Sequence, residues 1–186
     1  ILAMNEGLIA YVFKQVLGLD VPLPLPRLTY DEAMSRYGSD KPDTRFGLEL
    51  ADVSDIVERS GFQVFSSVVK NGGSVRAINA KGCVDRFARR EIDALVDFVK
   101  IYGAKGMAWI SMKPEGMQSP ITKFFSDSEM KSLLERTDAK TGDIVFFVGD
   151  KNKVVFDSLG NLRLKLAQRL GLVDEKAIDL LWVVDF

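Results

Sequence analysis

Ile144-Val145-Phe146-Phe147-Val148 is a run of apolar residues without a single polar position. Its β-branched and aromatic residues favour a strand, and its length is that of an ordinary strand. A strand that lacks polar positions is typical of the interior of a sheet. We therefore predict that these residues form a central strand.

The segments around this run alternate between strand and helix patterns. Three further runs are strand-like, at residues 62–69, 75–80 and 107–112. The first two are separated around Asn71-Gly72, a dipeptide typical of hairpin turns. Helical patterns occupy residues 52–61, 86–102, 126–134 and 154–170. This order predicts an α+β fold in two layers, with helices on one face of a mainly antiparallel sheet.

The two ends of the chain carry patterns of their own. Residues 8–17 have helical spacing, and Gly18 stands where a C-terminal cap belongs. Alternating prolines over residues 22–26 favour an extended connector, and a capping box at Thr29 and Glu32 starts another short helix. Residues 180–186 have the composition of a buried strand. We therefore expect a segment excised from a longer protein; the alternative is a terminal strand within the chain's own sheet.

Composition excludes several classes of function. The chain has 186 residues, with 25 basic and 26 acidic side chains, so no overall charge steers it toward nucleic acid. It has no histidine and one cysteine, Cys83, which removes histidine-dependent nucleophiles, disulfides and thiolate metal clusters. We predict that Cys83 is structural, because no basic partner accompanies it. No phosphate-binding loop or transmembrane run is found, and we expect a cytoplasmic protein with no membrane contact.

One basic cluster is a candidate for RNA binding. Arg86, Arg89 and Arg90 lie within about one turn of the helix predicted over 86–102. They stand at the helix start, where the macrodipole disfavours cations, so a bound RNA phosphate would explain them better than helix stability. Lys105 is a further candidate RNA contact. The alternative is a surface face neutralised by nearby acids, namely Asp85, Glu91 and Asp93.

A second polar stretch runs from Ser39 to Arg45. It has no aliphatic side chain apart from a proline ring, and its hydrogen-bonding residues are Ser39, Asp40, Lys41, Asp43, Thr44 and Arg45. Such a stretch is compatible with facing RNA, with the mouth of an active site, or with bracing neighbouring parts of the fold. We favour bracing slightly.

Four segments together resemble bacterial-type aspartyl-tRNA synthetase. They are Leu25–Met34, Arg36–Arg45, Phe98–Gly106 and Leu181–Phe186. The resemblance spans essentially the whole chain. It implies that residues 1–49 are a flanking segment of a class II catalytic domain and that residues 50–172 are an insertion with a GAD-like core at about 62–155. It further implies that residues 173–186 return to a catalytic-domain strand.

The resemblance also implies a parent activity. The family attaches aspartate to its tRNA with ATP and magnesium, usually as a homodimer. The class II signature motifs are missing here, so no catalytic residue, metal ligand or cofactor site is expected in this chain. The leading hypothesis is a non-catalytic module that positions or weakly contacts tRNA. The alternative is a structural brace or protein-docking module without RNA contact, and a free-standing small enzyme has the least support.

Overall fold

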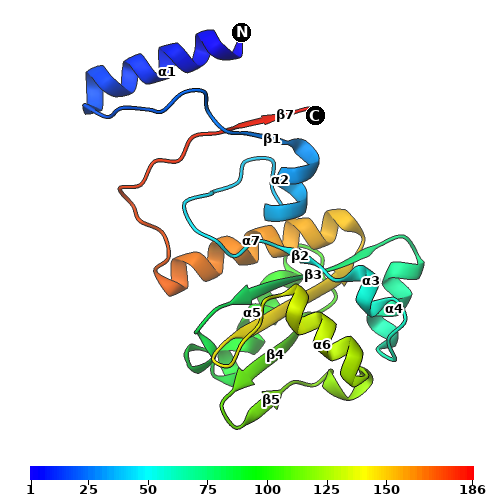
Figure 1. Cartoon of the computed structure of the whole chain (residues 1–186). Coiled ribbons are helices and arrows are strands. Elements are labelled where there is room, and N and C mark those ends of the chain that lie inside the picture. Colours follow the sequence, from blue (N-terminus) through cyan, green and yellow to red (C-terminus); the bar gives the residue numbers. More distant parts are fainter.

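A five-stranded antiparallel sheet forms the centre of the larger part of the molecule (Figure 1). The computed structural model describes all residues, Ile1 to Phe186. The strand order is β2-β3-β6-β4-β5. The strands are β2 (Ala51–Asp52), β3 (Ser74–Ala80), β4 (Ala108–Lys113), β5 (Gly116–Gln118) and β6 (Ile144–Asp150). The mainly antiparallel sheet of an α+β fold is thus confirmed.

The strand β6 is central, as its sequence predicts. It pairs with β3 over the register Ser74↔Asp150 to Ala80↔Ile144, and with β4 on its other side. Its first five residues are buried, because neighbouring strands flank it and helices cover it. The strand-like runs at 75–80 and 107–112 are β3 and β4, within a residue or two at each end.

Helices cover both faces of the sheet, so the expectation of two layers with one covered face is wrong. Ile144, Phe146 and Val148 pack against α5 (Arg89–Lys100) and α7 (Asn152–Leu170). Val145 and Phe147 face the opposite way, into a second apolar cluster. That cluster is covered by α3 (Ser54–Val57), α4 (Gln63–Lys70) and α6 (Asp127–Arg136). A strand that is apolar at every position has two faces to bury, which the three-layer arrangement achieves.

The predicted hairpin around Asn71-Gly72 is also wrong. Residues 63–70 form the helix α4 instead of a strand, and Asn71 is its C-cap. The apolar residues Phe62, Phe65 and Val69 are spaced for one helix face, and they pack into the second cluster. The short strand β2 takes the place beside β3 that the hairpin partner would have filled.

Several helix ends follow the local sequence. Thr29 caps α2 (Tyr30–Tyr37) and Ser126 caps α6, each in a complete capping box with a glutamate. Gly171 ends α7 with a left-handed backbone, as the position of that glycine predicts. Short 3-10 turns are found at η1 (Val84–Arg86) and η2 (Thr122–Phe124).

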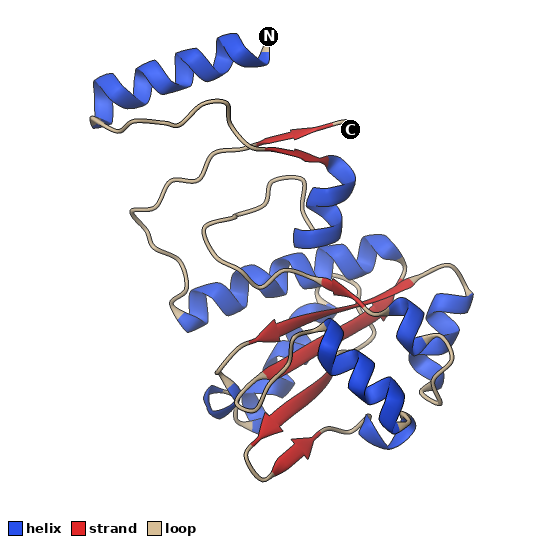
Figure 2. Ribbon diagram, viewed as in Figure 1, coloured by secondary structure: helices blue, strands red, loops and turns tan.

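A smaller flanking part lies on the outer side of α7 (Figures 1 and 2). It holds α1 (Leu2–Leu17), α2, and a two-stranded parallel sheet of β1 (Arg27–Thr29) and β7 (Trp182–Val184). The Trp182 indole donates to the buried Glu6 carboxylate at 3.0 Å, which ties β7 to α1. The strand β7 is half-buried rather than buried, because only β1 pairs with it. None of the helices is long and apolar enough to cross a membrane.

Candidate functional site

The candidate site is the junction between the sheet domain, residues 51–170, and the flanking part. The chain passes between them through residues 38–50, which we call the junction loop. At its start, α2 crosses α7 at two glycines. A Cβ on Gly38 would lie 2.6 Å from Phe156 O, and one on Gly160 would lie 2.6 Å from Gly38 O. Only glycine fits at both positions, so the backbones of α2 and α7 are in direct contact.

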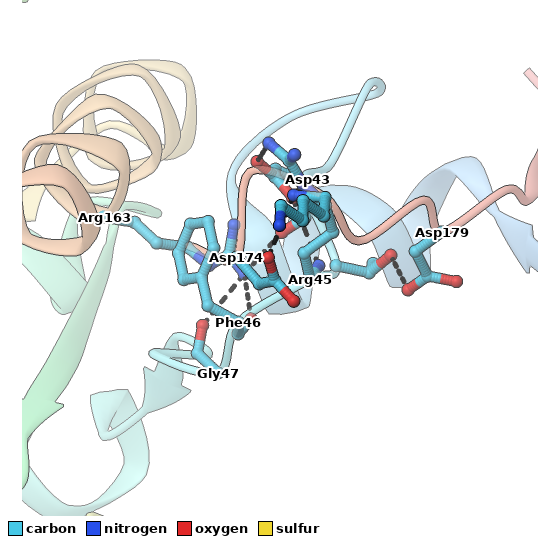
Figure 3. A network of polar contacts seen from close by, with 9 residues as sticks. Asp43, Arg45, Phe46, Gly47, Arg163, Asp174 and Asp179 are labelled. Carbon is cyan, nitrogen blue, oxygen red and sulfur yellow. Dashed lines mark hydrogen bonds and ion pairs between the residues drawn. The ribbon is translucent and has the colours of Figure 1, made fainter. Parts of the chain in front are cut away.

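Arg163 is the central residue of this junction (Figure 3). It projects from α7 and is 1% exposed. Its Nη2 donates to the backbone carbonyls of Asp43 at 2.8 Å, Phe46 at 2.8 Å and Gly47 at 2.9 Å. Its guanidinium also lies 4.1 Å from the ring centroid of Phe46 and 4.8 Å from that of Tyr37. One side chain of the sheet domain therefore holds several points of the junction loop.

The charge of Arg163 is balanced without an ion pair. No carboxylate lies within salt-bridge distance, so carbonyl dipoles and aromatic faces stabilise the cation instead. Burial lowers the pKa of Arg163 to about 10, which still leaves the side chain charged at neutral pH. Its Nε has no hydrogen-bond partner. Burying a charged donor has an unfavourable desolvation free energy, which the facing carbonyls offset only while they stay within hydrogen-bond distance.

Arg76 makes a second contact between the two parts. From β3 its Nη1 donates to the Ser35 carbonyl at 3.0 Å and to the Ser35 hydroxyl at 3.1 Å, both on α2. Its Nη2 lies 3.0 Å from the Asp52 carboxylate. The sheet domain thus reaches the flanking part through two arginines on different elements.

Two side-chain contacts between the junction loop and its neighbours add to these. Arg36 donates to both oxygens of Glu49, at 2.8 and 2.9 Å, and this hydrogen bonding holds the pKa of Glu49 below its usual value. Thr44 donates to Asp179 on the segment before β7, which joins the loop to the C-terminal strand (Figure 3).

The polar stretch predicted from the sequence lies in this loop. Asp43 and Arg45 pair with each other in a bidentate contact at 2.8 and 2.9 Å, which lowers the pKa of Asp43. The Ser39 hydroxyl accepts the backbone N–H of Lys41. The side chains of Asp40 and Lys41 make no hydrogen bond or ion pair, and Lys41 is exposed.

The structure separates the predicted basic cluster. Arg86 lies in η1, and α5 begins only at Arg89, so the prediction that Arg86 shares a helix face with Arg89 and Arg90 is wrong. The reason is the N-terminal cap of α5, where the Glu91 carboxylate accepts the Ala88 N–H and starts the helix there.

The three arginines and Lys105 have different surroundings. Arg86 donates to the carbonyls of Leu170 and Arg169 at the C-terminus of α7. Arg89 pairs with Asp93 at 2.9 Å and lies over the Trp109 ring. Arg90 is exposed and makes no ion pair or hydrogen bond. Lys105 lines a separate groove beside α4.

Reactive groups are scarce in the described residues. Cys83 is half-buried, its thiol donates to the Lys81 carbonyl at 3.0 Å, and burial raises its pKa. No three acidic or cysteine side chains converge in a way that could hold a metal ion.

Sequence reasoning did not single out Arg163 or Arg76. A signal for Arg163 exists, because it lies at helical spacing from Leu159 and Leu166 on the largely buried surface of α7. An arginine in such a position must find partners, and here those partners are carbonyls more than a hundred residues earlier in the chain.

Comparison with known proteins identifies the family of the chain. The family model described as "GAD domain" matches residues 65–159, just over half of the chain. The chain is 53% identical over 186 residues to the Aspartate--tRNA(Asp/Asn) ligase of Anoxybacillus flavithermus, and 54% identical over 187 residues to the Aspartate--tRNA ligase of Ruminiclostridium cellulolyticum. Each alignment covers 100% of this chain and 31% of the relative's length. The chain therefore belongs to the GAD domain family.

Proposed function

We propose that this chain is the insertion region of an aspartate–tRNA ligase, together with flanking segments of that enzyme's catalytic domain. Identity above 50% along the whole chain to proteins named as such ligases supports this proposal. The longer enzyme would join aspartate to tRNA at the expense of ATP, as a cytoplasmic homodimer. Within it we place the flanking segments at 1–49 and 173–186 and the insertion at 50–172.

In this proposal the chain itself is a non-catalytic module. Its role is to hold the sheet domain in a fixed orientation on the flanking part, so that the enzyme meets its tRNA with both parts in place. The observation that carries the proposal is the contact of buried Arg163 with three carbonyls of the junction loop.

We place the ATP and magnesium of the longer enzyme outside this chain, as the missing class II signature motifs imply, and we assign no step of the reaction to it. No group of three or more acidic or cysteine side chains that could hold a metal ion is found in the chain.

The test uses a full-length ligase that carries this sequence, with Arg163→Met. If Arg163 holds the sheet domain in place, the variant has a higher KM for tRNA. Aspartate-dependent ATP–pyrophosphate exchange, which needs no tRNA contact, stays at the wild-type rate. Arg163→Lys, which keeps a charged donor, is expected to restore part of the loss. Equal losses in exchange and in aminoacylation would contradict the proposal, since they would indicate damage to the catalytic domain itself.

Weak tRNA contact is a second candidate function, and Arg90 is the observation that favours it. Its guanidinium is exposed and unpaired, whereas Arg86 and Arg89 are engaged within the protein. Phosphate contacts lower the affinity as salt rises, with a slope set by the number of contacts. Arg90→Glu is therefore expected to reduce both the affinity of the chain for tRNA and its salt slope. If the affinity for tRNA and its salt slope are both unchanged in Arg90→Glu, this surface does not contact RNA.

A further inference from the structure

A groove of about 870 Å³ lies beside α4, in a part of the sheet domain that the junction does not use. Its apolar lining comes from α4 and the residue before it, from the start of β4, and from the segment before η2, with Phe62, Phe65, Val68, Met107, Ala108 and Ile121. Val64 also lines the groove and is 60% exposed. The volume is that of a ligand pocket, and the lining combines these apolar side chains with polar ones.

The groove adjoins an unpaired strand edge. The strand β5 pairs with β4 only at Ser111–Lys113. Continued by two residues, the same register would place Pro120 opposite Trp109, and proline has no N–H to donate. The outer edge of β4 before Ser111 therefore has no strand partner, and Ala108 on this strand and Met107 just before it line the groove together with Pro120. Such an edge can accept an added extended peptide through main-chain hydrogen bonds.

The charges at the groove are mainly positive. Lys105 and Lys151 line it, and neither takes part in an ion pair, although six other lysines of the chain do. The one acidic residue of the lining is Asp150, whose carboxylate accepts the backbone N–H of Lys151. A ligand with carboxylates beside apolar groups would complement this surface.

The aromatic residues near the groove favour a peptide over single-stranded RNA. Base stacking needs an open aromatic face. The Phe62 ring already stacks on Phe124 at 5.3 Å and meets Phe65 edge-on at 4.7 Å. The Phe124 ring in turn lies under the Lys123 ammonium at 5.1 Å. These rings are occupied by each other and by a cation, whereas aliphatic side chains can still enter the groove.

We propose that this groove binds an extended segment of a partner protein whose groove-facing side, formed by every second residue, carries both apolar and acidic side chains. The segment adds as a strand to the free edge of β4, directs its apolar side chains into the groove, and places its carboxylates near Lys105 and Lys151. This interaction is independent of the assignment as a ligase region.

Selection from a phage library of random decapeptides on the immobilised 186-residue chain tests the proposal. Enrichment of peptides that carry both apolar and acidic residues among every second position is expected. One enriched peptide, labelled with fluorescein, is then measured by anisotropy against variants of the groove. The double variant Lys105→Glu/Lys151→Glu and the single variant Val64→Glu are each expected to weaken binding at least about tenfold.

Two control variants change exposed positions outside the groove. Ile101→Glu and Lys165→Glu are expected to leave the affinity within about twofold of the wild type. The proposal is overturned if no sequence class is enriched, if enriched peptides are basic, or if binding ignores the groove variants. It is also overturned if oligouridine RNA displaces the peptide from the groove and Val64→Glu leaves the affinity for the peptide unchanged.

Discussion

Replacing Arg163 by methionine tests the junction most severely, because the change keeps a long side chain and removes only its charge and hydrogen bonds. The structure has Nη2 within 2.9 Å of three carbonyls. This nitrogen carries two protons, so we count two full hydrogen bonds. A hydrogen bond from a charged donor contributes about 1.5–3 kcal/mol, which gives a loss of about 3–6 kcal/mol.

Part of that loss is offset in the variant. Burial of the guanidinium is unfavourable, as its pKa of about 10 shows, and methionine does not incur this cost. The carbonyls of Asp43, Phe46 and Gly47 would meanwhile lose their donor. We therefore expect a net decrease of about 3 kcal/mol in the free energy of unfolding. For a chain of this length that corresponds to a melting temperature lower by about 6–12 °C.

Urea unfolding and amide hydrogen exchange give the measurements. The Leu50 N–H donates to the Arg36 carbonyl at 2.8 Å across the junction loop, so its exchange should accelerate in the variant. Lys165→Met, on the exposed surface of the same helix, is the matched control and should stay within about 0.5 kcal/mol of the wild type. If Arg163→Met matches this control and leaves Leu50 protected, the reasoning about the buried guanidinium is refuted.

Three further predictions use other parts of the fold. Gly160→Ala should destabilise the protein by about 2 kcal/mol in urea unfolding, because the new Cβ would lie 2.6 Å from Gly38 O, whereas Gly7→Ala, with nothing within 4 Å, should cause no loss. Asp143→Ala should cost about 3 kcal/mol in the same assay, since this buried carboxylate accepts hydrogen bonds from Gly82, Lys140 and Asn79; a loss below about 1 kcal/mol would contradict the inferred network. The pKa values of Glu49 and Asp55 are held below their usual range by hydrogen bonds from Arg36 and Arg136. These carboxylates therefore stabilise the fold above pH about 4, and the contribution is lost as the pH falls through their lowered pKa values. In Glu49→Gln, the free energy of unfolding from urea titrations should therefore fall less steeply below pH about 4 than in the wild type.

Sequence patterns predicted the parts of the fold that depend on near neighbours. The apolar run of β6, the capping boxes at Thr29 and Ser126 and the glycine stop at Gly171 all lie within a few residues of the feature that they determine. These predictions are confirmed, because backbone preferences and hydrogen bonds between near neighbours determine these features without help from distant residues.

The predictions that were wrong concern segments whose secondary structure depends on tertiary packing. The segment that forms α4 contains Phe62, Val64, Phe65, Val68 and Val69, which suit either a strand or a helix. The second face of the sheet needs cover, and a helix supplies it. The same cause explains why two layers were expected where three are found.

The candidate site was only partly visible in the sequence. The polar stretch around Asp43 and Arg45 was located, and bracing was the favoured interpretation, but its main partner Arg163 lies 120 residues further along the chain from Asp43. The basic cluster failed for a related reason, since Arg86 finds its carbonyl partner at Leu170, 84 residues away. Partners at such separations are set by the fold, and no local pattern specifies them.

The fixed orientation of the sheet domain on the flanking part can be measured directly. Spin labels are attached at Asp31→Cys on α2 and Ala94→Cys on α5, two exposed positions, in a Cys83→Ser background. Pulsed electron paramagnetic resonance then measures the distance between the two labels. We predict a single narrow distance distribution in the wild-type background and a broad one when Arg163→Met is added. A broad distribution with Arg163 in place would contradict a fixed junction.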